Sequence, residues 1–343
     1  MRVLVTGGAG FIGSNFARLL TSERPSWEVV VLDKLTYAGN PANIGDLRVF
    51  DGFSFLQGDI CDRELANGII PACDAVVNFA AETHVDRSLA GADDFVRTDI
   101  LGANTMLEVV RRHPRIRYVQ ISTDEVYGSL AAGSASEDTP LNPGNPYSAS
   151  KAGADLLALS YHRSFGLDVV ITRSSNNFGP YQYPEKVMPL FLTNLLEGKP
   201  VPLYGDGMNV RDWLFVEDNC RGVLLVLEKG VSGEIYNIGA GNELPNIQVT
   251  MMILEAVGAS KEMIRYVEDR PGHDRRYSLR WDKLAALGWR PRADFAAQLA
   301  ITAAWYRDNR AWWEPLKSGE FREYYRRMYE GRRGYSEATP ASG

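Results

Sequence analysis

The stretch RVLVTGGAGFIGSNF, residues 2–16, joins a short apolar run to a cluster of glycines and to the start of an amphipathic segment. The apolar run over 2–6 is rich in β-branched residues, which predicts a buried strand. The segment over 11–20 predicts a helix whose apolar side chains fall near one face, namely Ile12, Phe16, Leu19 and Leu20. Since EVVVLD (28–33) predicts a second strand, the order strand, glycine turn, helix, strand indicates the opening of a parallel sheet.

The same alternation of strands and helices continues along the next part of the chain. Further strands are predicted at 53–60, 75–81, 117–123 and 167–173, and helices at 91–113 and 147–166, the last ended by Gly166. Six or more strands separated by helices predict an α/β protein with a Rossmann-type, doubly wound parallel sheet.

The sequence changes in character after about residue 178. Pro, Gly and Tyr become frequent, and the alternation of strands and helices is lost apart from a run at 233–239. We therefore expect the sheet domain to span 1–178, with about 211–240 added to it. A smaller C-terminal α/β lobe is expected over 179–325, and the tail at 331–343 is expected to be disordered.

Composition and charge exclude several classes of protein. The 343 residues carry a formal net charge of −6, whereas a nucleic-acid-binding protein shows a basic surplus, so no nucleic-acid partner is expected. The 3 cysteines and 4 histidines lack metal-ligand spacing, so neither a metal site nor a disulfide framework is expected. The sequence shows neither a signal peptide nor a run of membrane-spanning length, which predicts a cytoplasmic protein with no membrane partner.

The glycine turn fits a dinucleotide-binding fingerprint. It matches G-x-G-x-x-G, and also G-x-x-G-x-x-G, through Gly7, Gly8, Gly10 and Gly13. Such glycines let the backbone approach a pyrophosphate at a helix N-terminus. Asp33 ends the next strand 20 residues after Gly13, where an acid binds the adenosine ribose hydroxyls and repels a 2′-phosphate. NAD is therefore expected rather than NADP, although Lys34 weakens that preference. The alternative is a plain turn with a helix-capping Asp33.

Tyr147 and Lys151 are four residues apart in a predicted helix, so they share one face. An ammonium beside a phenol stabilises the phenolate and lowers the pKa of the phenol. A phenolate can accept the proton of a substrate hydroxyl while hydride leaves the same carbon. Pairs of this spacing also occur on surfaces by accident, but after a dinucleotide fingerprint the pair indicates a catalytic base.

ISTDEVYG, residues 121–128, places two acids side by side at the end of a predicted strand. The residues from Ser122 to Glu125 fit the capping box S-x-x-E, so one explanation is a helix cap. Gly128 leaves little room for a helix, and the carboxyl end of a strand is where open α/β sheets place ligands. Asp124 and Glu125 are therefore predicted to transfer protons, with the cap as the alternative.

The chain resembles an extended short-chain dehydrogenase/reductase over residues 1 to about 325, and more narrowly the dTDP-glucose 4,6-dehydratases. The motifs that carry the resemblance are VTGGAGFIGSNF, LDKLTYAGN, NFAAETHVDRS, ISTDEVYG, YSASKAGAD, RSSNNFGPYQYPEK, YGDGMNVRDWLFVED and RPGHDRRY. The triplet Thr-Asp-Glu at 123–125 separates dehydratases from sugar 4-epimerases and UDP-glucuronate decarboxylases. The resemblance implies a tightly held NAD and dTDP-glucose as the substrate.

The resemblance also implies a reaction in three steps. Tyr147, helped by Thr123 and Lys151, deprotonates the sugar 4-hydroxyl while hydride passes from C4 to NAD. Glu125 then removes the C5 proton, and a protonated Asp124 supplies a proton to the departing 6-hydroxyl, so that water leaves. Return of hydride to C6 gives the 4-keto-6-deoxy sugar nucleotide. Adjacent carboxylates in a partly dry site suit this division because they push their pKa values apart.

The remaining site residues are carried over from the matching motifs. The resemblance implies NAD contacts at Gly7, Gly10, Phe11, Ile12, Gly13, Asp33, Lys34, Thr36, Asp59, Ile60, Ala80, Ala81, Thr98, Ser122, Tyr147, Lys151 and Asn177. It implies substrate contacts at Thr83, His84, Thr123, Asn176, Lys186, Val187, Pro202, Tyr204, Arg211, Asn246, Arg270, His273 and Tyr277. The sequence departs from the family at Thr83, where a serine is usual, and at Asp99, where an asparagine is usual.

Four of these residues have an individual expectation. Arg211 and Arg270 suit a diphosphate, because guanidinium groups donate to it in a fork, whereas the alternative for each is a solvated surface charge. Tyr204 is expected to stack on the base. His84 is expected either to contact the substrate or to be an ordinary core or loop histidine.

Other functions stay open at this point. A nucleotide-sugar 4-epimerase needs the tyrosine, the lysine and NAD but not the two acids. A UDP-sugar 4,6-dehydratase would differ in contacts to one methyl group of the base, worth about 1–3 kcal/mol. A non-catalytic NAD-sensing protein on this fold would not require the Tyr/Lys pair. The resemblance further suggests that the apolar faces of helices 91–113 and 147–165 pair across a homodimer interface.

Overall fold

The structure is a computed structural model that describes residues 1–270, 273–292, 294–330 and 334. The predicted disordered tail, apart from Gly334, therefore lies outside the described residues. Within those ranges, no helix combines the length and the apolar character that crossing a bilayer requires.

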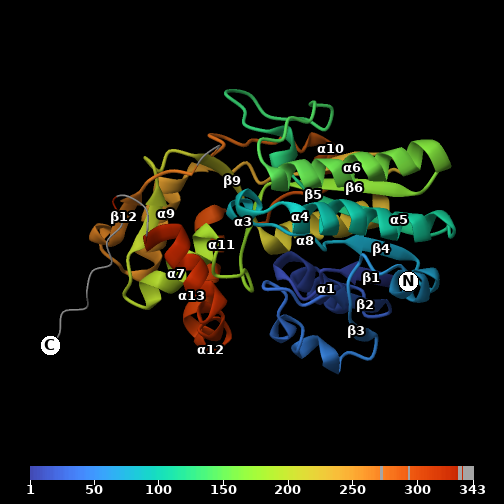
Figure 1. The fold of residues 1–343 in the computed structure, drawn as a ribbon, viewed down its shortest axis with the longest axis horizontal. Coiled ribbons are helices and arrows are strands. Elements are labelled where there is room, and N and C mark those ends of the chain that lie inside the picture. The colour runs from blue at the N-terminus through green and yellow to red at the C-terminus, as the bar shows by residue number, and fades with distance from the viewer. Residues whose placement is uncertain (271–272, 293, 331–333, 335–343) are drawn as a thin grey trace.

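The centre of the larger part of the molecule is a seven-stranded sheet in which every paired strand runs parallel to its neighbour (Figure 1). Its order is β10-β6-β5-β4-β1-β2-β3. The strands are β1 (Arg2–Thr6), β2 (Glu28–Asp33), β3 (Phe53–Gln57), β4 (Ala75–Asn78), β5 (Arg117–Thr123), β6 (Val169–Ser174) and β10 (Ile235–Ile238). This arrangement confirms the predicted doubly wound α/β fold.

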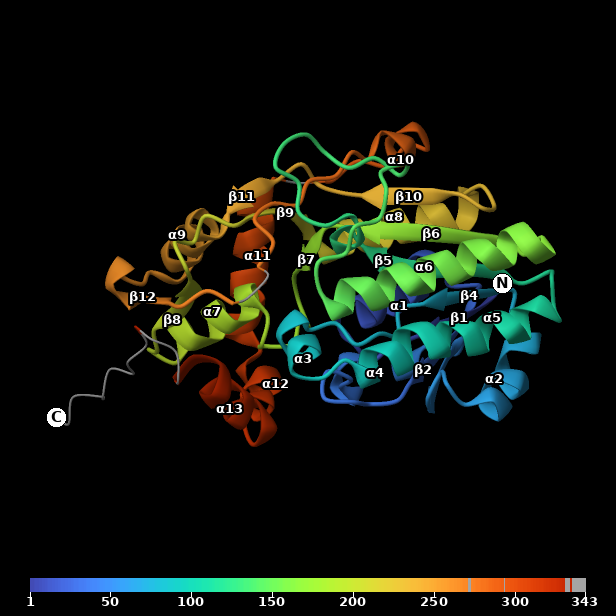
Figure 2. The same ribbon diagram turned by 45° about the horizontal axis from the view of Figure 1, so that its top comes forward.

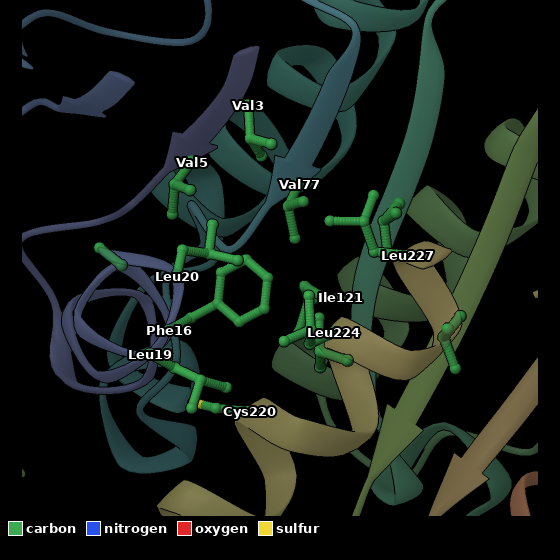
Figure 3. Packing of buried hydrophobic residues seen from close by; sticks show 14 of the residues in the cluster. Val3, Val5, Phe16, Leu19, Leu20, Val77, Ile121, Cys220, Leu224 and Leu227 are labelled. Carbon is green, nitrogen blue, oxygen red and sulfur yellow. The ribbon is translucent and has the colours of Figure 1, made fainter. Parts of the chain in front are cut away.

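Helices cover both faces of this sheet because its strands are apolar on both sides. Val3 and Val5 of β1 join one hydrophobic core, whereas Leu4 between them joins the other. The first core packs against α1 (Phe11–Glu23) and α8 (Val216–Lys229). Figure 3 shows Phe16 and Leu20 of α1 beside Leu224 of α8 under these strands. The second core packs against α2 (Arg63–Ile69), α5 (Ala103–Arg111) and α6 (Pro146–Phe165).

The helix predicted over 91–113 is not continuous. It consists of a short turn α4 (Asp93–Phe95), a π-helical segment η4 (Val96–Gly102) and α5. At Gly102 an added Cβ would lie 2.4 Å from the Ile60 side chain, so the segment packs closely against the loop after β3. Single π-helical turns inside helices frequently accompany functional sites.

The smaller lobe lies at one end of the sheet (Figures 1 and 2). It contains the sheet β11-β9-β7, formed by Glu243–Pro245, Val210–Phe215 and Asn176–Phe178, and the pair β12-β8, formed by Ile264–Val267 and Val201–Tyr204. Its longer helices are α7 (Val187–Leu196), α9 (Asn246–Val257) and α11 (Phe295–Asp308). The prediction that the alternation of helices and strands is lost after residue 178 was therefore wrong. Loops rich in Pro, Gly and Tyr separate these short elements and conceal them in the composition.

The remaining elements are short. They are α3 (Val85–Ala90), α10 (Asp282–Ala286), α12 (Arg310–Trp313), α13 (Glu320–Tyr325), the π-helical η8 (Arg326–Glu330), and the 3₁₀ turns Pro41–Asn43, Asp46–Val49, Ile70–Ala72, Asp124–Tyr127, Lys261–Met263 and Pro315–Lys317.

Candidate active site

A cavity of about 280 Å³ lies at the carboxyl ends of the parallel strands, next to β1 and β4. The chain runs outward from these two neighbouring strands in opposite directions, so this is the point at which a doubly wound sheet leaves a crevice. The glycine loop after β1, Asp33 at the end of β2 and residues 79–83 after β4 all line it. The predicted strand 75–81 ends early, at Asn78, because its last residues form the wall of this cavity.

The glycine loop is packed too closely for side chains. Gly7 has a positive φ of 64°, and a Cβ there would lie 2.6 Å from the backbone nitrogen of Ala80. A Cβ on Gly13 would lie 2.3 Å from the carbonyl oxygen of Gly7. Helix α1 begins at Phe11 with no acid in its first turn, so its N-terminal N–H groups and its dipole favour an anion such as a pyrophosphate.

Asp33 and Lys34 are held in different directions. The Asp33 carboxylate accepts the N–H of Ala9 at 2.9 Å and the N–H of Leu35 at 2.8 Å, which fixes it at the cavity wall. The Lys34 ammonium instead pairs with Asp59 at 2.9 Å. Because the lysine charge is compensated by Asp59, it does not offset the repulsion between Asp33 and a 2′-phosphate, and the site fits NAD.

All residues predicted to contact the cofactor line this one cavity, from Gly7 to Asn177. At its far wall, Oδ1 of Asn176, Oδ1 of Asn177 and Oε1 of Gln182 are buried and lack a hydrogen-bond partner within the described residues. Buried polar atoms are nearly always hydrogen-bonded in proteins, so these three indicate where a ligand donates.

Several lining residues were not predicted from the sequence. Tyr37 lines the cavity with the Arg87 guanidinium 3.8 Å from its ring centroid, and Arg87 pairs with the buried Glu185 at 3.1 Å. Glu82 and Gln182 also line it. These four lining residues (Tyr37, Glu82, Gln182 and Glu185) and Arg87 behind them all lie inside the quoted motifs LDKLTYAGN, NFAAETHVDRS and RSSNNFGPYQYPEK, next to predicted contacts, which was the available signal.

The stretch 122–125 both caps a turn and faces the cavity. The 3₁₀ turn Asp124–Tyr127 is capped by Thr123, whose Oγ1 accepts the N–H of Glu125 at 3.3 Å, and it stops at Gly128, where φ is 74°. A cap is therefore present, but the capping residue is Thr123 and not Ser122 as predicted. The Ser122 hydroxyl instead donates to Asp155 at 3.0 Å. One 3₁₀ turn leaves the two acids available for chemistry.

The two acids differ in their surroundings. Glu125 lines the cavity, whereas Asp124 is 2% exposed and lies behind the wall, accepting a bond from the Thr123 hydroxyl at 3.2 Å. Burial, the neighbouring Glu125 and Asp212 raise the pKa of Asp124 well above its ordinary value. Burial also raises the pKa of Glu125, but three cations oppose that rise, namely Arg270, Arg211 and Lys186. The site therefore favours a protonated Asp124 beside a more acidic Glu125.

Tyr147 and Lys151 lie one turn apart on α6 and both line the cavity. The Lys151 ammonium donates to the carbonyl oxygen of Ile121 at 2.7 Å. The predicted lowering of the Tyr147 pKa is not found in the chain alone. Burial, Glu125 and Asp99 raise that pKa well above its ordinary value, opposed by a hydrogen bond from Thr123. A phenolate at Tyr147 therefore requires positive charge that compensates these contributions.

The predicted substrate residues fall into two groups. Thr83, Thr123, Asn176 and Lys186 line the cavity. The others do not line it, and most lie in or next to the smaller lobe, namely His84, Val187, Pro202, Tyr204, Arg211, Asn246, Arg270, His273 and Tyr277. Arg211 lies 4.4 Å from the Tyr277 ring centroid, and Tyr204 is in edge contact with His273 at 6.0 Å.

His84 is a buried residue whose ring meets Tyr324 edge-on at 5.4 Å. Burial and the nearby Lys186 lower its pKa well below its ordinary value, so it is neutral. Its position favours the core role over a direct substrate contact. Tyr204 carries another aromatic neighbour, Tyr329, stacked at 5.8 Å with an interplanar angle of 28°.

Two cations near Glu125 donate their hydrogen bonds to backbone carbonyl oxygens. Arg211 donates to the carbonyl oxygens of Val210 at 2.8 Å and Asp274 at 2.9 Å, and Lys186 donates to that of Thr83 at 2.6 Å. No carboxylate of the described ranges lies within ion-pair distance of either one. Cations without a carboxylate partner suit an anionic ligand such as a diphosphate. In the part of the chain that the structure describes, no cluster of His, Cys, Asp and Glu could hold a metal ion.

Known proteins resemble this chain over most of its length. The model of the GDP-mannose 4,6 dehydratase family matches residues 4–302. A dTDP-glucose 4,6-dehydratase of Streptomyces niveus is 54% identical over 93% of this chain and 96% of that protein. One of Neisseria meningitidis serogroup B is 44% identical over 94% of this chain and 97% of that protein.

Solved structures give the same result. DesIV, a dTDP-glucose 4,6-dehydratase from Streptomyces venezuelae crystallised with NAD bound, has a TM-score of 0.90 and 54% identity over 92% of this chain and 100% of that chain. UDP-glucuronic acid 4-epimerase from Bacillus cereus, in complex with NAD, has a TM-score of 0.84 and 28% identity over 90% of this chain and 99% of that chain. From the family match and these identities, the chain belongs to the GDP-mannose 4,6-dehydratase family.

Proposed function

We propose that this protein is an NAD-dependent dTDP-glucose 4,6-dehydratase, a hydro-lyase that converts dTDP-glucose to dTDP-4-keto-6-deoxyglucose and water. The observation that carries the proposal is the pair Asp124 and Glu125, placed beside Tyr147 and Lys151 at a cavity that fits a dinucleotide. Relatives named for this activity are more than half identical to the chain. The product makes the protein an enzyme of deoxysugar biosynthesis.

The roles of the residues follow from their surroundings. NAD, when bound, brings a positively charged nicotinamide that accepts hydride from the sugar C4 and returns one to C6. Tyr147, in contact with Thr123 and on the same helix face as Lys151, accepts the proton of the 4-hydroxyl. Glu125 at the cavity wall removes the C5 proton, which a 4-ketone acidifies. Asp124, protonated because it is buried, supplies the proton that leaves with the 6-hydroxyl as water.

The diphosphate of the substrate is assigned to Arg211 and Lys186, with Arg270 beside them. Arg270 pairs with the buried Asp86 at 3.1 Å, which orients its guanidinium toward the same region. Asn246 has a buried Oδ1 without a partner in the described residues, which fits a ligand hydroxyl or amide. Tyr204 remains the candidate for stacking on the base.

Two further proposals concern organisation. Residues 1–178 together with the later segment at about 211–240 would form the NAD-binding domain, because β10 pairs with β6 and α8 packs against one face of the sheet. The rest of 179–325 would bind the nucleotide sugar. Strands β7 and β9 belong to the smaller sheet, so residues 176–178 already contribute to the smaller lobe, and the second segment of the NAD-binding domain begins at α8. The free thiols of Cys61, Cys73 and Cys220 fit a cytoplasmic, reducing location.

A homodimer is the proposed assembly. Large apolar side chains are exposed along α3, η4 and α6, namely Leu89, Val96, Leu101, Leu156 and Phe165. η4, α5 and α6 lie side by side on the outside of the sheet (Figure 2). Exposed apolar patches often mark interfaces between proteins. A second copy of the chain, with its own η4, α5 and α6, would cover this patch.

The decisive experiment uses the purified protein without added NAD, incubated separately with dTDP-glucose and UDP-glucose. Mass spectra of the nucleotide sugars would show loss of one water from dTDP-glucose, and no comparable loss from UDP-glucose. NAD released by denaturing the protein would be measured in parallel. No change of mass with either sugar, in protein that contains NAD, would contradict the proposal and leave epimerisation, which changes no mass.

A further inference from the structure

Asp99 is a buried carboxylate that the mechanism above does not use. It lies in the π-helical segment η4 and is 2% exposed. Its Oδ1 accepts the N–H of Glu82 at 3.0 Å and its Oδ2 accepts the Ser150 hydroxyl at 2.6 Å. No cation of the described ranges lies within ion-pair distance of it. A carboxylate held in this way is costly to ionise unless nearby charge compensates it.

The charged groups around Asp99 come from two other elements. Helix α6 presents the Lys151 ammonium and the Tyr147 phenol, and the loop after β4 presents the Glu82 carboxyl. Burial raises the pKa of Asp99 to about 6, with Lys151 opposing the rise. Burial and then Asp99 raise the pKa of Glu82 to about 7. The carboxylate therefore lies between two titrating groups and the lysine of the catalytic pair.

Ser150 connects Asp99 to the turn that carries Tyr147. The Ser150 oxygen lies 2.6 Å from Oδ2 of Asp99 and 2.8 Å from the carbonyl oxygen of Tyr147. One hydroxyl hydrogen serves only one of these acceptors at a time. When Asp99 is ionised, the hydroxyl donates to it. When Asp99 is protonated, Asp99 donates to the Ser150 oxygen, and the hydroxyl is released to bond the Tyr147 carbonyl.

We propose that Asp99 is a titratable positioning residue, whose ionisation changes the hydrogen bond at the Tyr147 turn and opposes formation of the Tyr147 phenolate. Asparagine has nearly the same shape as aspartate but carries no charge. The Asp99 carboxylate therefore makes the pKa of Tyr147 depend on pH in a way that an asparagine would not. This proposal rests on the proposed function, in which Tyr147 accepts the proton of the 4-hydroxyl. One of the two measurements below, the titration of Tyr147 itself, does not depend on the proposed function.

The test compares the wild type with Asp99→Asn in the holoenzyme, with Asp93→Asn as a control because that acid is exposed on α4, directly before η4. At about pH 5 the side chain at position 99 is neutral in both proteins, because Asp99 of the wild type is largely protonated there, so their turnover of dTDP-glucose should coincide. As the pH rises through 6, Asp99→Asn should become faster by up to about tenfold, since a nearby negative charge raises a phenol pKa by about one unit. Turnover of Asp93→Asn should follow the wild type throughout.

Ultraviolet difference titration of tyrosinate, each protein against its Tyr147→Phe derivative, should give a Tyr147 pKa about one unit lower in Asp99→Asn. A Ser150→Ala variant keeps the charge and removes the hydrogen-bond link, so it should keep the wild-type Tyr147 pKa while turnover falls a few-fold. Identical Tyr147 titrations in wild type and Asp99→Asn would overturn the proposal. Absence of any turnover by the wild type would overturn the proposed function instead and leave the titration result valid.

Discussion

Replacing Asp124 with asparagine tests the claim that this buried acid is protonated in the folded protein. The side chain is 2% exposed, and its Oδ2 has no hydrogen-bond partner among the described residues. Burial and the adjacent Glu125 raise its pKa well above its ordinary value. Asparagine keeps the acceptor that Thr123 uses and matches the neutral form of the acid, so the substitution removes the charge without removing volume.

The sign and the size of the effect follow from linkage. The folded-state pKa of Asp124 lies above the unfolded value of about 3.9, so the folded protein binds the extra proton between those two values. The free energy of unfolding therefore falls as the pH rises from about 4 through the folded-state pKa, by about 1.4 kcal/mol for each unit of elevation. Asparagine has no such dependence. Its amide hydrogens, buried without partners, cost about 1–3 kcal/mol at every pH.

The assay is urea unfolding of both proteins from pH 5 to pH 9 with saturating NAD. We expect the wild-type stability to decline relative to Asp124→Asn as the pH rises, by about 1.4 kcal/mol for each pH unit between 5 and the folded-state pKa of Asp124. Asp282→Asn serves as the control, because that side chain is 74% exposed and its substitution should give a constant offset from wild type. Parallel curves for wild type and Asp124→Asn would refute the reasoning and place an ionised Asp124 in the folded state.

Three more outcomes are expected. Glu125→Gln should end incorporation of solvent deuterium at the sugar C5 and slow turnover by about 10²–10⁴; deuterium at C5 at the wild-type rate would exclude Glu125 as the base. Gly13→Ala, whose Cβ would lie 2.3 Å from the Gly7 carbonyl oxygen, should weaken NAD binding by at least about tenfold in calorimetry, and unchanged affinity would contradict the close packing. Leu156→Glu on α6 should convert a dimer to a monomer in sedimentation, whereas Ile301→Glu, equally exposed but on α11, should leave it intact. A dimer that survives Leu156→Glu would place the interface elsewhere.

The parts of the site that could be predicted are those with a local pattern. The glycine loop, Asp33 and the pair Tyr147 and Lys151 have fixed spacings because a turn, a strand end and a helix face each impose one. Their convergence on one cavity follows from the parallel sheet, which brings strand ends from distant parts of the chain to a single edge. Tyr37 and Glu185 have no such spacing. Both contact Arg87, which links the segments that carry them. Contacts between distant segments of this kind leave no periodic pattern in the sequence.

The interrupted helix and the pKa of Tyr147 could not be predicted, because both depend on contacts between segments that are distant in the sequence. The break in the helix over 91–113 follows from close packing against Ile60, 42 residues before Gly102. The sequence predicted a lowered pKa for Tyr147 from its lysine, but Glu125 and Asp99 come from other elements and act in the opposite direction. Burial, which is the largest contribution to each of these shifts, is a property of the whole fold.

Cations of the smaller lobe account for the difference in pKa between the two acids. Asp124 and Glu125 are adjacent in sequence, and burial raises both pKa values. Glu125 differs because Arg270, Arg211 and Lys186 all lower its pKa, and those residues lie on the segments assigned to the diphosphate. A bound diphosphate would neutralise part of this positive charge and raise the pKa of Glu125, which makes it a stronger base at the moment when the sugar is in place. The cations assigned to the diphosphate thus oppose the rise that burial gives the pKa of Glu125, and a bound diphosphate would weaken that opposition.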